Sequence, residues 1–126
     1  MHRLTLAVTP LEVERSRSDG YELLTVEGEL DIATASRMIA ALNEVLADME
    51  VPLVVDLSGV VFMDSTGLAL LMNARRRAMR NGQGFAIVCP VGPISRLFEI
   101  ADMVESLRVR PDRDSARLAA TQPAGA

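Results

Sequence analysis

Two short apolar runs, separated by segments with helical spacing, constrain the fold of this chain more than any other feature. Residues 53–57 (LVVDL) and 85–89 (FAIVC) are almost continuously apolar, which is typical of strands buried on both faces of a parallel sheet. Neighbouring parallel strands need a long crossover connection, usually a helix. The pattern therefore predicts an α/β fold whose sheet has a mostly parallel centre.

Segments with apolar residues three and four positions apart should form the helices of this fold. They are residues 35–49, about 66–81, the stretch that opens at Pro93, and residues 112–120. Thr34 is the candidate N-cap of the first helix, and Asn81-Gly82 ends the second. The expected apolar face of the second helix, on which Arg75 also falls, comprises Leu68, Leu71, Met72 and Met79.

The N-terminal part predicts an antiparallel edge for the sheet. Residues 11–17 alternate between apolar and polar side chains, and residues 21–28 resume this strand character. Asp19-Gly20 between them is a hairpin turn signal. With a last short strand at residues 107–109, the element order becomes ββαβαβαβα, in a small mixed sheet of about four to five strands packed with helices.

These elements fit one domain, which we expect to span residues 10–120. Residues 1–9 are an N-terminal extension or an edge strand. Residues 121–126 are small and uncharged, with Pro123 and Gly125, and are expected to form a flexible tail.

Composition narrows the possible functions. Cys89 is the only cysteine, which excludes an internal disulfide and a cysteine-based zinc site. No apolar run reaches the ~18 residues of a membrane span, and the N-terminus lacks a secretory signal pattern. We therefore expect a cytoplasmic protein without membrane insertion. The net charge of −4 argues against direct nucleic-acid binding.

Charge is unevenly distributed along the chain. Residues 1–66 hold 4 arginines and 12 acids, a balance of −8, and residues 67–126 hold 9 arginines and 5 acids, a balance of +4. Such a dipolar surface can orient a protein partner, although charges also simply coat solvated faces. The run Arg75-Arg76-Arg77 has the same two interpretations: it meets an acidic partner, or it keeps a helix soluble.

No set of residues suited to catalysis is present. His2 is the only histidine and lies at the end of the chain. The sequence contains no phosphate-binding loop, zinc-protease motif or nucleophile elbow. We therefore expect a protein that is not an enzyme and that has no cofactor and no metal site.

The segment from Asp56 to Leu68 has a chemistry of its own, because a buried strand runs into a polar loop that opens a helix. Ser65 and Thr66 would lie at the helix N-terminus, where backbone N–H groups are unpaired and the helix dipole is positive. In one interpretation Ser65 is the N-cap and Asp64 favours the dipole. In the other, Ser65 is a reversible phosphoacceptor, which gains roughly −1.5 to −2 charges on modification and so switches the binding of a partner.

Two motifs give the chain a resemblance to the STAS-domain family, and most of all to the bacterial anti-sigma factor antagonists. The first is Val26-Glu27-Gly28-Glu29-Leu30-Asp31 with the following Ala33-Thr34-Ala35, and the second is Asp56-Leu57-Ser58 with Phe62 to Leu68. With Arg96-Leu97-Phe98, the resemblance spans about residues 10–120. Ala69 departs from the pattern, since many members have glycine there, and this places loop packing or partner fit in doubt.

The resemblance implies a partner-switching function. The serine that matches Ser65 is phosphorylated by an anti-sigma factor that is also an ATP-using serine kinase. The unphosphorylated antagonist binds this kinase and frees the sigma factor, and a serine phosphatase resets the system. Asp31, Asp64, Thr66 and Gly67 join Ser65 as expected partner-binding residues, while the nucleotide site belongs to the kinase. We expect a monomer or weak dimer.

Three alternatives stay open on the sequence. Thr66 follows Ser65 directly, so either hydroxyl is a possible acceptor. STAS domains also serve as constitutive accessory subunits of lipid-transport ATPase complexes or of stress-signalling assemblies, in which the same surface docks without a switch. The third alternative is an enzyme, which would be indicated by a turnover that Ser65→Ala abolishes without loss of folding.

Overall fold

The computed structural model describes residues 10–18, 20–47 and 51–122, which form a five-stranded sheet and four helices. The strands are β1 (Glu12–Ser18), β2 (Tyr21–Leu30), β3 (Leu53–Met63), β4 (Phe85–Val88) and β5 (Val109–Arg110). The helices are α1 (Ala35–Ala47), α2 (Ser65–Arg80), α3 (Pro93–Ile100) and α4 (Arg113–Ala120). The predicted element order and α/β class are confirmed. Asp19, the end of the first predicted helix, the N-terminal extension and residues 123–126 lie outside the described residues.

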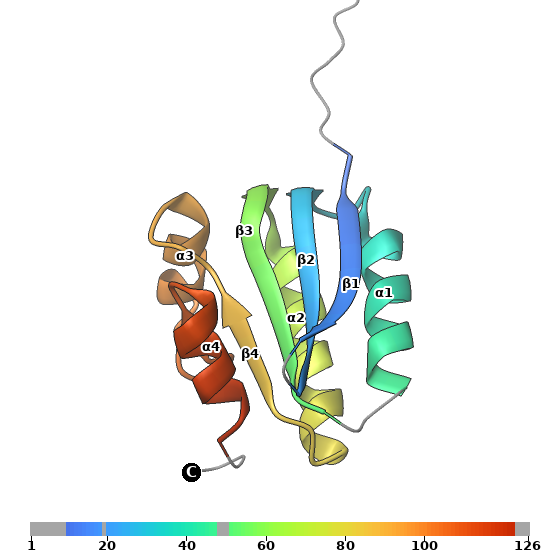
Figure 1. The fold of residues 1–126 in the computed structure, drawn as a ribbon. Coiled ribbons are helices and arrows are strands. Elements are labelled where there is room, and N and C mark those ends of the chain that lie inside the picture. The colour runs from blue at the N-terminus through green and yellow to red at the C-terminus, as the bar shows by residue number, and fades with distance from the viewer. Residues whose placement is uncertain (1–9, 19, 48–50, 123–126) are drawn as a thin grey trace, which may run out of the picture.

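The strands lie in the sheet in chain order, β1-β2-β3-β4-β5 (Figure 1). β1 pairs antiparallel with β2, and the other three pairings are parallel. This is the predicted parallel centre with an antiparallel edge. The carboxyl ends of β2, β3 and β4 meet at one edge of the sheet, the upper edge in Figure 1.

Helices cover the two faces of the sheet unequally. The main core fills the space between the sheet and α1, α2 and α3, with fully buried Leu24, Met38 and Phe98 among its members. A second, smaller core lies under α4, whose Ala116, Ala119 and Ala120 pack over β3 and β4. Within the described residues no helix combines the length and apolar character that a membrane span needs.

β3 is longer than the apolar run that predicted it. Ser58 and Gly59 do not end the strand, because its pairing with β2 continues beyond them through register shifts next to Glu27 and Gly28. A Cβ at Gly59 would lie 2.6 Å from Cγ of Glu27, so glycine permits this close approach of the strands. The extra length carries β3 to Met63, directly before the polar segment that opens α2.

The buried face of α2 agrees with the predicted one in part, since Leu71 is buried and Leu68 and Met72 pack against the main core. The buried residues of α2 are Gly67, Leu71, Ala74 and Ala78. Met79 is 41% exposed, so its assignment to this face is wrong, while Arg75 is half-buried. Alanine and glycine at three of the four buried positions allow the helix to lie close to the sheet.

Candidate functional site

The predicted site lies where β2 and β3 end together. Leu30 and Met63 are paired in the parallel register, and Asp31 and Asp64 are the residues that directly follow the two strands. The backbone N–H of Asp64 donates to the carbonyl oxygen of Leu30 at 3.3 Å, which ties the two chain segments to each other. The fold therefore brings the two sequence motifs together at the carboxyl edge of the sheet (Figure 1).

Asp64 is the N-cap of α2. Its backbone is extended, and its Oδ1 accepts hydrogen bonds from the backbone N–H groups of Thr66 at 2.9 Å and Gly67 at 3.4 Å. The interpretation of Ser65 as the cap is therefore wrong, because Ser65 is the first helical residue. An N-cap side chain satisfies N–H groups two and three positions ahead, and here the aspartate already does so.

Ser65 is left exposed at the positive end of α2. Its hydroxyl makes no hydrogen bond to any of the described residues, while the neighbouring Thr66 is half-buried. A hydroxyl with no task in the local structure can be approached by a large partner. Of the two candidate acceptors, Ser65 is thus the more accessible.

Gly67 allows the first turn of α2 to sit directly on the strand ends. A Cβ at this position would lie 2.5 Å from Cγ of Met63 and 3.1 Å from Cγ of Leu30. Any larger residue would push the helix away from the sheet, since protein interiors are close-packed. Gly67 therefore positions Ser65 relative to the end of β3 rather than offering a contact of its own.

Asp31 organises the turn that leads into α1. Its Oδ1 accepts hydrogen bonds from the backbone N–H groups of Ala33 at 3.0 Å and Thr34 at 3.2 Å. The Thr34 hydroxyl donates to the carbonyl oxygen of Glu29 at 2.7 Å and accepts from the N–H of Asp31. Thr34 directly precedes α1, as predicted for its N-cap, but its hydroxyl points back into the turn instead of accepting from an N–H group of the helix.

Exposed apolar side chains lie near these polar residues, and the sequence reasoning missed them. Ile32 follows Asp31 and is 79% exposed, and Val61 and Phe62 near the end of β3 are 67% and 48% exposed. Val91, beyond β4, is 90% exposed. Strand alternation carries part of the signal: once Met63 faces α2, Phe62 must face the opposite side of the sheet.

A buried carboxylate, also missed by the sequence reasoning, lies further down β3. Asp56 is 3% exposed; it accepts hydrogen bonds from the Ser58 hydroxyl at 2.6 Å and from Nε of Arg113 at 2.7 Å. Burial acts to raise the pKa of Asp56, but the hydrogen bonds from Ser58 and the Arg113 guanidinium outweigh it and hold this pKa below its ordinary value. The ion pair joins α4 to the sheet.

Cys89 is a packing residue in this environment. It is 3% exposed, and burial together with the nearby Asp56 charge raises the pKa of its thiol to about 11. Because the thiolate is the reactive form of cysteine, a thiol that stays protonated at neutral pH is inert.

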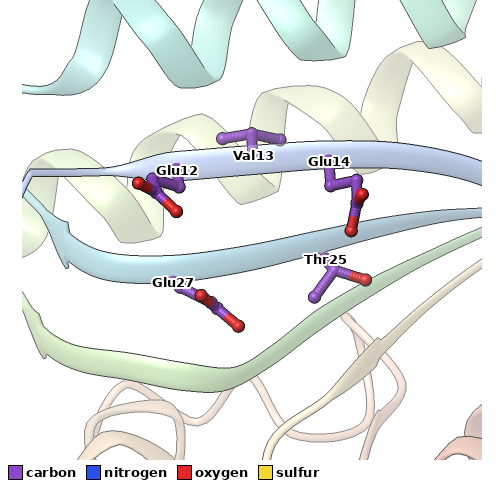
Figure 2. A pocket seen from close by; sticks show the side chains of 5 residues that line it. All are labelled: Glu12, Val13, Glu14, Thr25 and Glu27. Atoms are coloured by element: carbon purple, nitrogen blue, oxygen red, sulfur yellow. The ribbon is translucent and has the colours of Figure 1, made fainter.

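The face of the sheet that points away from α1 carries an acidic hollow of about 340 Å³ on β1 and β2. Figure 2 shows Glu12, Glu14 and Glu27 around it, while Val13 points away from them, towards α1. In the part of the chain that the structure describes, no group of three or more His, Cys, Asp or Glu side chains is arranged to hold a metal ion. We refer to Glu12, Glu14 and Glu27 as the acidic patch.

Comparison with known proteins identifies relatives over most of the chain. The family described as "Mlab, STAS domain" matches residues 13–109. The anti-sigma-B factor antagonist of Staphylococcus aureus is 30% identical over 79% of this chain and 92% of its own length. The anti-sigma-F factor antagonist RsfB of Mycobacterium tuberculosis is 43% identical over 42% of this chain and 43% of its own.

A solved structure agrees with these sequence matches. The crystal structure of an anti-sigma factor antagonist from Mycobacterium paratuberculosis superposes with a TM-score of 0.82 at 28% identity, covering 89% of this chain and 95% of that one. The fold, the family match over residues 13–109 and the Staphylococcus aureus relative agree, and the chain belongs to the STAS-domain family.

Proposed function

We propose that this protein is an anti-sigma factor antagonist that is switched off by phosphorylation of Ser65. In its unphosphorylated state it binds an anti-sigma factor that is also a serine kinase, and the sigma factor is released. The kinase then transfers the terminal phosphoryl group of ATP to the Ser65 hydroxyl, and a serine phosphatase hydrolyses the phosphoserine. One observation carries this proposal: Asp64 caps α2, which leaves Ser65 exposed and without a structural task.

Phosphorylation at this position should leave the fold intact. The dipole of α2 favours a phosphate at its N-terminus by roughly 0.3–1 kcal/mol, while the adjacent Asp64 carboxylate opposes the new charge. No hydrogen bond of the Ser65 hydroxyl to a described residue has to be broken. The two electrostatic effects partly cancel, so the modification acts on binding rather than on folding.

The surroundings of Ser65 explain why a partner would respond to the phosphate. Ile32, Val61 and Phe62 offer apolar surface at the same edge of the sheet, which a partner buries when it binds. A phosphate dianion introduced into such a contact must lose its hydration or face like charges, at a cost of about several kcal/mol. Release of the partner follows from this cost.

The partner-binding residues proposed are Asp31, Asp64, Ser65, Thr66 and Gly67. The two carboxylates hold backbone N–H groups and add negative charge at the rim, which suits a basic group on the partner. The protein acts by binding rather than by catalysis. We propose a cytoplasmic location and a domain of residues 10–120 that works as a monomer or weak dimer.

The test begins with four baits in lysate from the native host: wild type, Ser65→Ala, Ser65→Asp and the control Ser115→Asp. Bound proteins are identified by mass spectrometry. We expect Ser65→Ala and Ser115→Asp to retain a kinase-type anti-sigma factor and Ser65→Asp to lose it. The captured kinase is then purified and incubated with wild type and ATP, and phosphopeptide mapping should locate the phosphate on Ser65.

Two outcomes would contradict the proposal. Capture of one partner by all four baits, above all a transporter ATPase, would show a constitutive accessory subunit. A phosphate on Thr66 in wild type, retained in Ser65→Ala, would move the switch to the neighbouring hydroxyl.

A further inference from the structure

α2 is unusually basic in its second half. The helix carries four arginines and no acidic residue: Arg75, Arg76, Arg77 and Arg80. Arg76 donates to Oδ1 of Asn73 at 2.8 Å, and Arg77 donates to Oδ1 of Asn43 on α1 at 2.6 Å. Both partners are neutral amides, so these hydrogen bonds position the guanidinium groups without neutralising their charge.

Arg77 lines an apolar groove between α1 and α2, which we call the α1–α2 groove, and Arg76 donates to Asn73, which also lines it. Its volume is about 240 Å³. It is lined by Ile39, Leu42, Asn43, Leu46, Leu70, Asn73, Ala74 and Arg77. Ile39 is 42% exposed, which leaves apolar surface open to a partner, and the Arg77–Asn43 hydrogen bond joins the two helices within the groove.

The groove is separate from the Ser65 surface. The helix rises 1.5 Å per residue, so Leu70 and Arg77 lie about 8 and 18 Å along α2 from Ser65. A ligand in the groove therefore contacts the side of the helical layer, whereas a partner at Ser65 contacts the edge of the sheet.

We propose that the α1–α2 groove is a docking site for an acidic, amphipathic helical segment of a partner protein. Apolar side chains spaced three and four positions apart on such a helix fit a floor of leucine, isoleucine and alanine. Carboxylates beside them pair with Arg77 in the groove and with the exposed Arg76 and Arg80 on the same helix, since guanidinium groups bind carboxylates in a fork geometry.

Charge complementarity selects this occupant. Together α1 and α2 carry five arginines and one acid, and that acid, Glu44, lies 3.7 Å from Arg15 of β1. A second copy of the chain would offer its acidic patch, but there the only lining apolar residue, Val13, points into its own core (Figure 2). The acidic patch would therefore supply carboxylates for the arginines but no apolar side chains to fill the α1–α2 groove.

The test uses two stapled helical peptides of about fourteen residues, each with leucine three and four positions apart and with either glutamate or lysine elsewhere. Stapling removes the cost of helix formation. Each peptide is titrated into the ¹⁵N-labelled full chain, and amide shifts are followed by NMR. We expect the glutamate peptide to shift α1 and α2 resonances around the groove and to bind about tenfold or more tighter than the lysine peptide.

Variants locate the contact. Ile39→Asp should weaken the glutamate peptide by about tenfold through lost apolar contact and added repulsion. The double variant Arg76→Gln with Arg80→Gln, both at exposed positions, should lose much of the preference for the glutamate peptide over the lysine peptide. Added salt should then weaken binding of the glutamate peptide less than it does in wild type. Leu118→Asp, on the exposed side of α4, and Ser65→Asp should leave peptide binding unchanged.

Three results would overturn the proposal. One is equal binding of the two peptides, and another is a set of shifts centred on the Ser65 edge or on β1 and β2. The third is a stable dimer in light scattering that Ile39→Asp dissociates, since a second copy would then occupy the groove. Circular dichroism establishes whether each variant is folded. If Ile39→Asp does not fold, the double variant Arg76→Gln with Arg80→Gln still decides the test.

Discussion

All four helices carry a serine in their first turn, and two of these serines, Ser36 of α1 and Ser65 of α2, are exposed and make no hydrogen bond to a described residue. In α3, the Ser95 hydroxyl accepts from the N–H of Gly92 and donates to its carbonyl oxygen, both at 2.9 Å. In α4, the Ser115 hydroxyl lies 2.8 Å from Oδ1 of Asp112, the N-cap. In α2, the Ser65 hydroxyl bonds to none of the described residues.

The difference is one of position within the turn. Ser95 and Ser115 occupy the third helical position, from which a side chain reaches back to the cap. In α2 that position is held by Gly67, because a side chain there would meet Met63 and Leu30. The serine of α2 stands at the first position, where it faces solvent. Packing of a helix against strand ends thus leaves a hydroxyl available for function.

The first position of α4 sharpens the comparison. It is held by Arg113, whose guanidinium pairs with buried Asp56 at 2.7 Å and so joins α4 to the sheet. The equivalent residue of α2 makes no such link. The first residue of α4 therefore stabilises the fold, whereas the first residue of α2 is available to a partner.

The largest expected effect is on phosphorylation. With the cognate kinase and ATP, Ser65→Ala should abolish incorporation of phosphate, whereas Ser95→Ala and Ser115→Ala should leave it unchanged. The reason is that the hydroxyls of Ser95 and Ser115 are already bonded to their own helix starts. Radiolabelled ATP and phosphopeptide mapping measure this, and labelling on Ser115 would break the comparison.

Gly67→Ala tests why the third position of α2 differs. The added methyl group would meet Met63 and Leu30, and overpacking of this kind costs about 1–3 kcal/mol. Urea unfolding should report a lower free energy of unfolding by this amount. Ser115→Ala at the equivalent position of α4 meets no such obstacle, and a larger loss there than at Gly67 would contradict the packing argument.

Asp56→Asn tests the anchor of α4. Loss of the charge weakens the bonds to Arg113 and Ser58, and because Arg113 is half-exposed we expect a loss of about 1–2 kcal/mol at neutral pH. Chemical denaturation at pH 7 measures the change. Ser65→Ala is the control, because Ser65 holds in α2 the position that Arg113, the partner of Asp56, holds in α4. We expect no comparable loss of stability for it.

The same carboxylate predicts a direction for acid sensitivity. The pKa of folded Asp56 lies below its ordinary value of 3.8, so its contribution to stability is present above that pH and is lost as the pH falls through the folded-state pKa. Wild type should therefore lose stability more steeply than Asp56→Asn below about pH 4. Parallel Tm curves for the two proteins would assign the acid sensitivity to other groups.

Asp64→Ala removes the N-cap of α2 and should cost about 0.5–2 kcal/mol, as N-cap removal does elsewhere. The N–H groups of Thr66 and Gly67 lose their acceptor, and the orientation of Ser65 loosens. Thermal unfolding gives the stability change, and Asp64→Asn, which retains an acceptor oxygen, should recover most of it. A failure of Asp64→Asn to do so would assign the effect to charge.

Ser65→Ala should have the smallest effect on stability, within about 0.5 kcal/mol, because no hydrogen bond to a described residue is lost. Urea unfolding beside Ser95→Ala provides the contrast, since the latter removes two hydrogen bonds from a buried side chain. A larger loss for Ser65→Ala would show that the hydroxyl has a structural task after all.

Much of the fold was predictable because its signals are local. The apolar runs at residues 53–57 and 85–89, the helical spacing between them and the helix end at Asn81-Gly82 each depend on a few neighbouring residues. The end of β3 was not predictable in the same way. Ser58-Gly59 has the composition of a turn, and it stays in the strand because Glu27 of β2 packs across it.

At the site, the sequence by itself determined the polar segment, its place between a strand and a helix, and the residue types that permit a switch. The tertiary structure decided which residue caps α2. Aspartate and serine are both strong N-cap residues, so composition does not choose between Asp64 and Ser65. The choice follows from the parallel pairing of Leu30 with Met63, which holds Asp64 extended at the sheet edge and leaves Ser65 to begin the helix.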